Sequence, residues 1–367
     1  MFHFPGMREL RRMNEQKKIL IVRLGAIGDV VRTLPSLHLL RRRFPEARIA
    51  WAVEEKAAEI LEGHPGLDEM ILVPRKKWSF LLKNPFTIPK ALAEIGKFLQ
   101  SIREKKFDTV LDFHSSIKSG IISLATGADE RIGYTARHSR EMNFLFNNVR
   151  IPLRQKRISR MERNLTLLKH FGIEPDEIKA DIAISGDDRN YIDDHLKRER
   201  LDDKKKAIIF PGASRRQTYK KWGAKNYAAL AEMLISKTDF YAILAWGPGE
   251  LEECKEIASM VNSKVHISPG TTLKQLAELI RRCDLFIGGD TGAMHISCAM
   301  GTPCLVVYGP TDPVINSPWG KKYRIVYDEA DCSPCRKRRC RKGKCFENLT
   351  PERVYAEVES FIGHHEF

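Results

Sequence analysis

Short apolar runs alternate with longer amphipathic stretches over the first half of the chain. The run at 17–24, KKILIVRL, is rich in β-branched residues and ends at Gly25. After it, the apolar residues of 25–45 recur at the spacing of a helix. The same reasoning predicts strands at 47–55, 69–75 and 108–114 and helices at 56–65 and 89–105. Strands that alternate with helices predict a parallel sheet covered by helices.

The alternation breaks near residues 150–205, where two charged helical segments follow one another. It then resumes with short apolar runs that end in Gly or Pro, as buried parallel strands do, at 206–214, 240–250, 263–270, 283–295 and 302–310. The chain is therefore expected to form two Rossmann-like, doubly wound α/β domains facing a central cleft. The expected division is an N-terminal extension (1–16), a first domain (17–185), a linker (186–205) and a second domain (206–367).

Length and charge narrow the class of protein. The 367 residues fit two domains. The 62 Lys and Arg against 47 Asp and Glu give a formal charge of +15, which indicates an anionic partner: nucleic acid, an anionic membrane or a phosphorylated substrate. No stretch approaches the roughly 18 apolar residues of a membrane span, and the start lacks the apolar core of a signal peptide. A cytoplasmic protein that at most touches a membrane surface is expected.

A glycine-containing turn, RLGAIGD at 23–29, follows the first predicted strand and opens a helix. Gly25 and Gly28 allow a tight turn, and the free N–H groups of a helix start favour an anion. Asp29, in the first helical turn, is a candidate general base, although a carboxylate there also caps a helix or pairs with its dipole. The turn lacks the G-x-G-x-x-G pattern with an acidic partner, which disfavours a dehydrogenase.

A basic turn, FPGASRRQTYKKW at 210–222, ends the first strand of the second predicted domain. Ser214 and Thr218 supply hydroxyl donors, and four cations lie near them in the sequence: Arg215, Arg216, Lys220 and Lys221. Such a group fits a diphosphate, because lysine acts on phosphate as a point charge. The alternative is a solvated basic loop.

The segment GGDTGAMHISCAMGTP at 288–303 is the most specific of the three. A strand ends at its glycines and a helix begins near Thr291, with Asp290 or Thr291 as its cap. Gly292 lets a ligand approach the backbone, whose N–H groups point at an anion. His295 lies one turn further on the same helix face, where it either contacts the ligand or makes a structural hydrogen bond.

Together, these three segments resemble the ADP-heptose:lipopolysaccharide heptosyltransferases of glycosyltransferase family 9, in the expected order over residues 17–360. The resemblance implies a GT-B fold, with the acceptor in the N-terminal domain and the nucleotide sugar in the C-terminal one. It also implies inverting transfer of a heptose from ADP-heptose to the inner core of lipopolysaccharide, with lipid A–Kdo or a heptosylated core as acceptor. No metal or cofactor is implied for catalysis, and the chain has no Asp-x-Asp motif for a metal–diphosphate.

The resemblance assigns roles by position. Asp29 matches the catalytic base, and Lys220, in a Lys-x-Trp pattern with Trp222, matches the lysine that faces the donor phosphates. The donor-binding helix start comprises Asp290, Thr291, Gly292 and His295. Within WGPGELEE (246–253), the resemblance assigns the ribose hydroxyls to Glu250 or Glu252.

On the acceptor side, the resemblance points to Gly28, Lys118, Arg137 and Arg140. The three cations are candidates for phosphate or carboxylate groups of the acceptor, and plain surface charge is the alternative. Residues 75–99 mix aromatic and aliphatic side chains with Lys and Arg. This segment either lies in a membrane interface or encloses a lipid-linked acceptor, or it is a packed insertion of the acceptor domain.

Four cysteines lie close together in a basic segment, CSPCRKRRCRKGKC: Cys332, Cys335, Cys340 and Cys345. In a cytosolic protein this spacing favours a structural zinc or other metal site, with free thiols and disulfides as alternatives. The seven Lys and Arg between 336 and 344 leave a nucleic-acid-binding protein open, although no nucleic-acid-binding signature accompanies them.

Among anionic partners, lipopolysaccharide at the inner face of the cytoplasmic membrane is favoured, and no nucleic acid is expected. The enzyme is therefore expected to associate peripherally with that membrane. Within enzymes, the remaining alternative is a related GT-B glycosyltransferase that uses another nucleotide sugar or glycolipid acceptor.

Overall fold

The chain divides into two compact units, the first ending at Ala183 and the second beginning at Ile184. The structure is a computed structural model that describes residues 17–155, 157–176, 178–213, 217–320, 322–335, 340 and 343–363. The N-terminal extension expected at 1–16 and the candidate donor-binding Ser214 lie outside the described residues.

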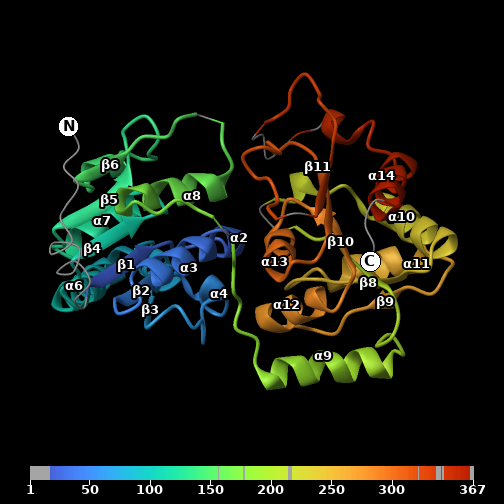
Figure 1. The fold of residues 1–367 in the computed structure, drawn as a ribbon, viewed down its shortest axis with the longest axis horizontal. Helices are drawn as coiled ribbons and strands as arrows, with labels where there is room; N and C mark the ends of the chain where they lie inside the picture. The colour runs from blue at the N-terminus through green and yellow to red at the C-terminus, as the bar shows by residue number, and fades with distance from the viewer. Residues whose placement is uncertain are drawn as a thin grey trace. The chain divides into compact units, whose positions relative to one another are not determined.

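The first unit contains a six-stranded parallel sheet in the order β3-β2-β1-β4-β5-β6 (Figure 1). Its strands are β1 (Lys18–Val22), β2 (Arg48–Val53), β3 (Glu69–Leu72), β4 (Thr109–Asp112), β5 (Glu130–Tyr134) and β6 (Val149–Ile151). Its helices are α2 (Ile27–Val31), α3 (Leu34–Arg43), α4 (Glu55–Ala58), α5 (Arg75–Leu81), α6 (Ile88–Glu104), α7 (Ile117–Ala125) and α8 (Arg160–Leu168), with the 3-10 turns η1 (Pro85–Thr87), η2 (Asn143–Leu145) and η3 (Lys169–Phe171).

The second unit contains another six-stranded parallel sheet, in the order β12-β11-β10-β7-β8-β9. Its strands are β7 (Lys206–Phe210), β8 (Tyr241–Leu244), β9 (His266–Ile267), β10 (Leu285–Gly289), β11 (Cys304–Tyr308) and β12 (Tyr323–Tyr327). Its helices are α9 (Gly186–Arg198), α10 (Ala224–Lys237), α11 (Leu251–Ser259), α12 (Leu273–Arg281), α13 (Gly292–Met300) and α14 (Pro351–Gly363), with the 3-10 turns η4 (Thr218–Lys220) and η5 (Lys344–Phe346).

Both sheets have the same strand order when strands are counted from the start of each unit. The chain begins at an inner strand, adds two strands on one side, and then returns to add three on the other. The order therefore reverses between β1 and β4 in the first unit and between β7 and β10 in the second. In such sheets, ligands bind outside the carboxyl ends of the strands at this reversal.

The structure confirms the strands expected from the apolar runs, and it adds three that the sequence analysis did not predict. β6 and β12 are edge strands, and β5 lies next to β6. All three contain partly exposed residues, so they lack a continuous apolar run. The single helix expected over 25–45 is two helices, α2 and α3. Pro35 is at the start of α3, where its missing N–H costs no helical hydrogen bond.

The expected linker at 186–205 is corrected by the structure, because most of it is α9 and belongs to the second unit. Ile192 and Leu196 are four residues apart and fully buried, and α9 packs against α12. The many charged residues of this helix lie around a narrow apolar face, which explains why composition alone favoured a linker.

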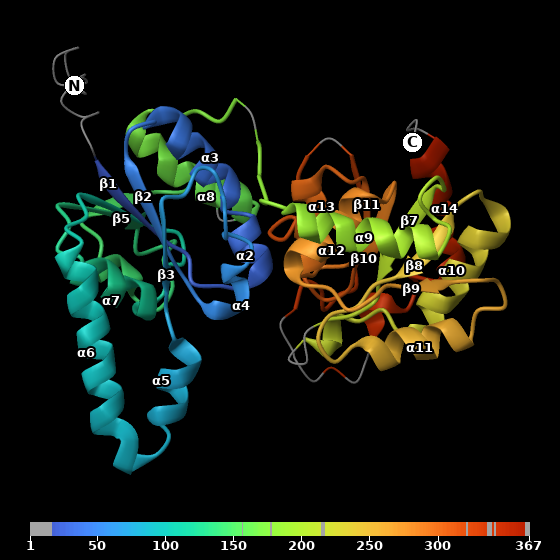
Figure 2. The same ribbon diagram turned by 90° about the horizontal axis from the view of Figure 1, so that it is seen from below.

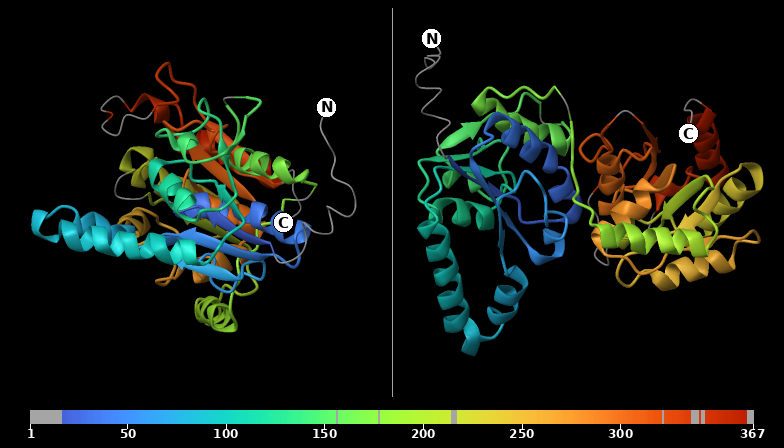
Figure 3. Two further views of the ribbon diagram at one scale, coloured as in Figure 1. Left: turned by 90° about the vertical axis from the view of Figure 1, so that its left-hand side faces the viewer. Right: turned by 60° about the horizontal axis from the view of Figure 1, so that its bottom comes forward.

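The cores lie between the sheets and their helices. In the second unit, Ile209, Leu244 and Ile287 come from neighbouring strands and pack in one apolar cluster with residues of α10, α11 and α14. Among the described residues, no helix combines the length and apolar character needed to cross a membrane. One part of the first unit leaves its body: α5, η1 and α6 form a hairpin that projects away from the sheet (Figures 2 and 3).

Candidate active site

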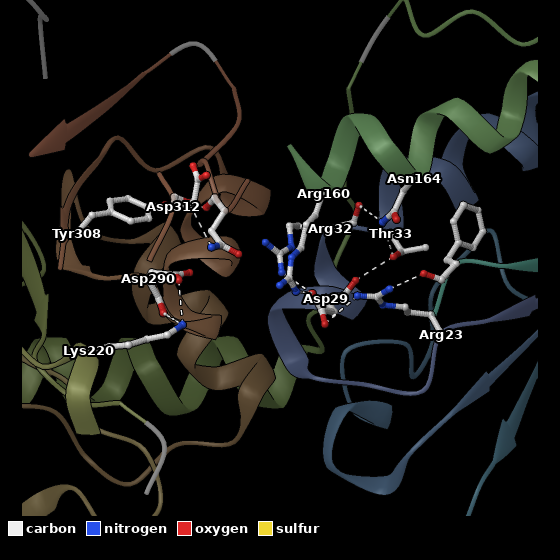
Figure 4. A network of polar contacts seen from close by, with 12 residues as sticks. Arg23, Asp29, Arg32, Thr33, Arg160, Asn164, Lys220, Asp290, Tyr308 and Asp312 are labelled. Atoms are coloured by element: carbon white, nitrogen blue, oxygen red, sulfur yellow. Dashed lines mark hydrogen bonds and ion pairs between the residues drawn. The ribbon is translucent and has the colours of Figure 1, made fainter. Parts of the chain in front are cut away.

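In the first unit, Asp29 follows the carboxyl end of β1 and lies in the first turn of α2. Its carboxylate contacts three guanidinium groups (Figure 4). Arg23 Nη2 lies 2.7 Å from Oδ2, Arg160 Nη1 lies 3.2 Å from Oδ1, and Arg32 donates to Oδ1 as well. The side chain of Asp29 retains 16% of its exposure, so the carboxylate is enclosed but still reached by solvent. The predicted position in the first helical turn is confirmed.

These arginines decide the charge of Asp29. Burial raises its pKa, but the charges of Arg23, Arg32 and Arg160 together hold the pKa well below the ordinary value of 3.8. Asp29 is therefore ionised throughout the neutral range. A carboxylate held ionised, partly accessible and past the carboxyl end of a central strand is placed to accept a proton or to orient a cation.

Neighbouring backbone and side chains fix this arrangement. Arg23 also donates to the carbonyl of Phe113, which follows β4, so the guanidinium joins the two central strands. Thr33 Oγ1 donates to the carbonyl of Asp29 at 2.8 Å, and Asn164 Nδ2 of α8 donates to Thr33 Oγ1 at 2.9 Å. Within the described part of the chain, two buried nitrogens of Arg32, Nε and Nη1, have no hydrogen-bond partner. This surplus of donors makes the region suited to an anionic ligand.

The other acceptor-side candidates of the first unit are one buried glycine and three exposed cations. Gly28 is buried in α2, next to Asp29. Lys118, on α7, and Arg137 and Arg140, between β5 and η2, are exposed. Burial and the charge of Arg23 are the main causes that lower the pKa of His114 to about 3. The charge of Arg140 contributes to the same shift. The structure keeps all three cations accessible to a ligand, and their role stays a prediction.

In the second unit, Lys220 and Asp290 form an ion pair past the ends of β7 and β10 (Figure 4). Lys220 Nζ lies 2.9 Å from Asp290 Oδ2 and donates to the carbonyl of Asp290 at 3.4 Å. The two side chains are only 12% and 8% exposed. An ammonium group has three donors, so one remains for a ligand. Trp222, two residues later, is buried and donates to the carbonyl of Leu349 at 2.6 Å, which anchors the turn.

The helix that follows β10 begins as predicted. α13 starts at Gly292 with Thr291 as its N-terminal flanking residue, but neither Asp290 nor Thr291 caps it by a side-chain hydrogen bond. The Asp290 carboxylate accepts instead from Lys220. Within the described residues, the buried Thr291 Oγ1 has no partner, so a donor is left beside the free N–H groups of the helix start. His295 is buried and stacks on Trp319, with ring centroids 5.5 Å apart.

The structure separates the two ribose candidates. Glu250 turns back against β7, where a Cβ atom on Gly212 would lie 2.0 Å from its Oε2, and it accepts from the N–H of Gly247 at 2.9 Å. Burial raises the pKa of Glu250. Glu252 points outward, with 84% of its side chain exposed, and pairs with Lys255. Of the two glutamates, Glu250 lies beside the strand ends.

We predict that Glu250→Gln lowers the affinity for ADP by about tenfold or more, the usual cost of a hydrogen bond to a charged group. Glu252→Gln is the matched control, because it removes the same charge from an exposed side chain that pairs with Lys255, and its affinity should match that of the wild type. Isothermal titration with ADP measures both. Equal affinities for the two variants would contradict the assignment.

Two other residues of the predicted diphosphate-binding turn, Thr218 and Lys221, take no part in the Lys220–Asp290 ion pair. Thr218 begins η4 and is exposed. Lys221, part of the expected cradle, pairs instead with Glu253 of α11. Arg215 and Arg216 lie outside the described residues.

Sequence reasoning missed the arginines around Asp29 and the stacking partner of His295. Arg32 had a local signal, because it follows Asp29 by three residues and so shares its helix face. Arg160 is 131 residues from Asp29 and Trp319 is far from any predicted motif, so spacing offers no signal for either.

The cysteine segment is only partly covered by the described residues. Cys332, Cys335 and Cys345 carry free thiols, so these three form no disulfide. Burial, together with the neighbouring cysteines, raises the pKa of the Cys345 thiol. In the described part of the chain, no three His, Cys, Asp or Glu side chains are placed to hold a metal ion. The structural zinc expected from spacing stays a prediction, and most of the basic residues between the cysteines lie outside the description.

Comparison with known proteins adds independent information. A model described as glycosyltransferase family 9 (heptosyltransferase) matches residues 95–346. The chain is 26% identical over 322 residues to the lipopolysaccharide core heptosyltransferase OpsX of Haemophilus influenzae, with 85% of each chain covered.

Two solved structures are similar over nearly the whole chain. A glycosyl transferase family 9 protein from Veillonella parvula matches with a TM-score of 0.77 and 22% identity, covering 96% of this chain and 99% of that one. The E. coli heptosyltransferase WaaC with ADP matches with a TM-score of 0.73 and 24% identity, covering 94% and 99%. These likenesses confirm the expected GT-B fold.

Proposed function

We propose, since this chain belongs to glycosyltransferase family 9, the heptosyltransferases, that it transfers a heptose from ADP-heptose to the inner core of lipopolysaccharide. The enclosed but accessible carboxylate of Asp29 is the observation that carries the proposal. The second unit supports it with a partly satisfied lysine and an unpartnered hydroxyl at a helix start, which suit a diphosphate.

In the proposed reaction, a hydroxyl oxygen of the acceptor attacks the anomeric carbon of the heptose. The new carbon–oxygen bond forms as the bond to the diphosphate breaks, so the configuration inverts and ADP leaves with the electron pair. The proton of the hydroxyl passes to Asp29. Because the arginines lower the pKa of this carboxylate, it is a weak base, and it accepts the proton only when bond formation has made the hydroxyl strongly acidic.

On the donor side, negative charge grows on the diphosphate as ADP departs. Lys220 supplies a positive charge, and the start of α13 supplies N–H groups and the hydroxyl of Thr291. Asp290 holds Lys220 in place before the donor arrives, so little reorganisation is needed at the transition state. These groups replace a divalent cation in the proposal, so no metal or cofactor takes part in the transfer.

The acceptor is an anionic glycolipid in this proposal. Lys118, Arg137 and Arg140 would bind its carboxylate or phosphate groups, since all three are exposed on the unit that contains Asp29. The substrate is anchored in lipid, so the enzyme works from the cytoplasm at the inner face of the cytoplasmic membrane as a peripheral protein.

Release of ADP tests the proposed function. Purified protein is given ADP-heptose with lipid A–Kdo, with a heptosylated core, or with no acceptor, each with and without EDTA. We expect ADP release that requires one of the acceptors and is unchanged by EDTA. No release with either acceptor, together with turnover of another nucleotide sugar, would overturn the assignment of ADP-heptose. Loss of activity in EDTA that Mg²⁺ restores would overturn metal-independent transfer.

A further inference from the structure

The large apolar side chains that are exposed gather in one part of the first unit. Most of those found among the described residues lie between 72 and 145, from the end of β3 through α5, α6 and α7 to η2. They are Leu72, Phe80, Leu82, Phe86, Leu92, Ile117, Ile121, Leu124, Met142 and Leu145. Isolated apolar residues at a surface are ordinary, but such a concentration marks an interaction site.

The hairpin of α5, η1 and α6 is firmly held at its root. Trp78 packs on Phe98 with ring centroids 5.1 Å apart, and both join the apolar core beneath the sheet. Arg75, at the start of α5, binds both carboxylate oxygens of Glu54. Lys77 pairs with Glu94 at 3.0 Å, which ties α5 to α6. The base of the hairpin is therefore packed against the rest of the first unit.

The tip of the hairpin is ordered as well, yet its apolar residues pack on little else. Asn84 Oδ1 accepts from the N–H of Phe86 at 3.1 Å, and Thr87 Oγ1 donates to the carbonyl of Asn84 at 3.0 Å. Phe86 is nevertheless 93% exposed and Phe80 75% exposed. α6 has 17 residues, about 25 Å at 1.5 Å per residue, so the tip stands well clear of the sheet (Figures 2 and 3). The expected packed insertion therefore describes the root but not the tip.

Positive charge surrounds these phenylalanines. Residues 75–99 contain six Lys and Arg and one acidic residue, Glu94. Four of the lysines are exposed and form no ion pair with any described residue: Lys76, Lys83, Lys90 and Lys97. Unneutralised lysines beside exposed aromatic rings match the two layers of an anionic bilayer surface, with phosphate outside and acyl chains beneath.

We propose that the tip of the α5–α6 hairpin inserts Phe80 and Phe86 into the interface of an anionic lipid bilayer, while the surrounding lysines contact the phosphate headgroups. The inference deepens the proposed function, because it rests on a lipid-anchored acceptor and names the part of the chain that meets the lipid. α7, which packs beside α6, exposes Ile117, Ile121 and Leu124 on one face and would extend the contact.

Flotation with vesicles that contain no acceptor tests this binding. The wild type should float with phosphatidylcholine vesicles that contain phosphatidylglycerol, and much less with pure phosphatidylcholine. The variant Phe80→Ser/Phe86→Ser should bind anionic vesicles at least about tenfold more weakly, because each ring contributes by its buried area. The variant Lys76→Glu/Lys83→Glu/Lys90→Glu should bind more weakly too, by about fivefold or more for each lysine lost.

The matched control is Tyr241→Ser/Met260→Ser, which removes exposed apolar side chains of the second unit and should bind like the wild type. Insertion itself is measured with Phe86→Trp, whose added fluorescence should be quenched by brominated lipid in anionic vesicles. Wild-type binding by the double phenylalanine variant, or absence of that quenching, would overturn the proposal.

Activity separates this inference from the proposed function. With a water-soluble, deacylated acceptor, the double phenylalanine variant should turn over like the wild type, since the tip contacts only lipid. A comparable loss on that acceptor would mean that the tip supports the fold or the reaction, and would count against membrane insertion. Failure of heptose transfer with intact vesicle binding would instead refute the proposed function alone.

Discussion

Replacing Asp29 with asparagine is expected to lower turnover by about 10²- to 10⁴-fold, the range that a positioned general base contributes. Asparagine keeps the shape of the side chain but cannot accept the proton of the acceptor hydroxyl. Affinity for ADP should stay unchanged, because the donor residues lie in the other unit. Steady-state ADP release measures the loss, and titration with ADP measures donor binding.

Stability must be followed in the same variant. Removing the charge of Asp29 leaves Arg23 and Arg32, both largely buried, without their counter-charge, which destabilises a folded protein. Asp176→Asn is the control, since Asp176 pairs with Arg42 at the surface. Near-normal turnover by a folded Asp29→Asn protein would refute the role of base.

The pH dependence of kcat/KM also tests the role of Asp29. The reaction needs ionised Asp29, so kcat/KM should fall only as the pH drops through its lowered pKa. Arg160 is the most exposed of the three arginines, at 36%, and its removal should least disturb the fold. Arg160→Gln should raise the pKa of Asp29 and so move the acid limb of the profile to higher pH. An unmoved acid limb would show that a different group controls it.

Replacing Lys220 with methionine is expected to lower turnover of ADP-heptose by about 10²- to 10³-fold, the loss typical of removing one preorganised donor to a developing negative charge. Affinity for ADP should fall as well. Lys221→Met is the matched control, because the adjacent lysine is directed to Glu253 and should affect turnover little. Equal losses in the two variants would mean that general positive charge of the turn, rather than Lys220, is what matters.

A double variant is needed as well, because Asp290, the partner of Lys220, is buried. Without the lysine, Asp290 becomes an unpaired buried carboxylate, which alone could weaken the fold. Lys220→Met/Asp290→Asn removes both charges, and it should recover thermal stability without recovering turnover. Recovered turnover would contradict a direct role for Lys220 in stabilising the departing ADP.

The sequence predicted those features that depend on local spacing. The end of β1, the helical turn with Asp29 and the helix start at Thr291 each follow from an apolar run broken by glycine, and all three are confirmed. Features that depend on distant partners were not predictable. Arg160 reaches Asp29 across 131 residues, and the pairing of Lys220 with Asp290 spans 70, while hydrophobic periodicity carries no information on such pairs.

Composition misled at two places for a related reason. A charged helix was predicted at α9, but its charges concealed an apolar face of two fully buried residues, Ile192 and Leu196, so the helix was assigned to a linker and not to the second unit. At 75–99, the pattern fitted both a packed insertion and a membrane contact. The structure shows that Trp78 and Phe98 are packed, as the first description requires, and that Phe86 is exposed, which leaves it free for the proposed membrane contact.

The repeated strand order of the two sheets bears on how such an enzyme can diversify. Each unit is complete as a sheet, with its own core and its own chemical groups at the reversal of strand order. In the proposed function, substitutions around Lys118 or Arg140 would alter the choice of acceptor and leave the residues of the second unit unchanged. Under this proposal, acceptor specificity can change during evolution while donor specificity is retained, because the two are encoded in separate units.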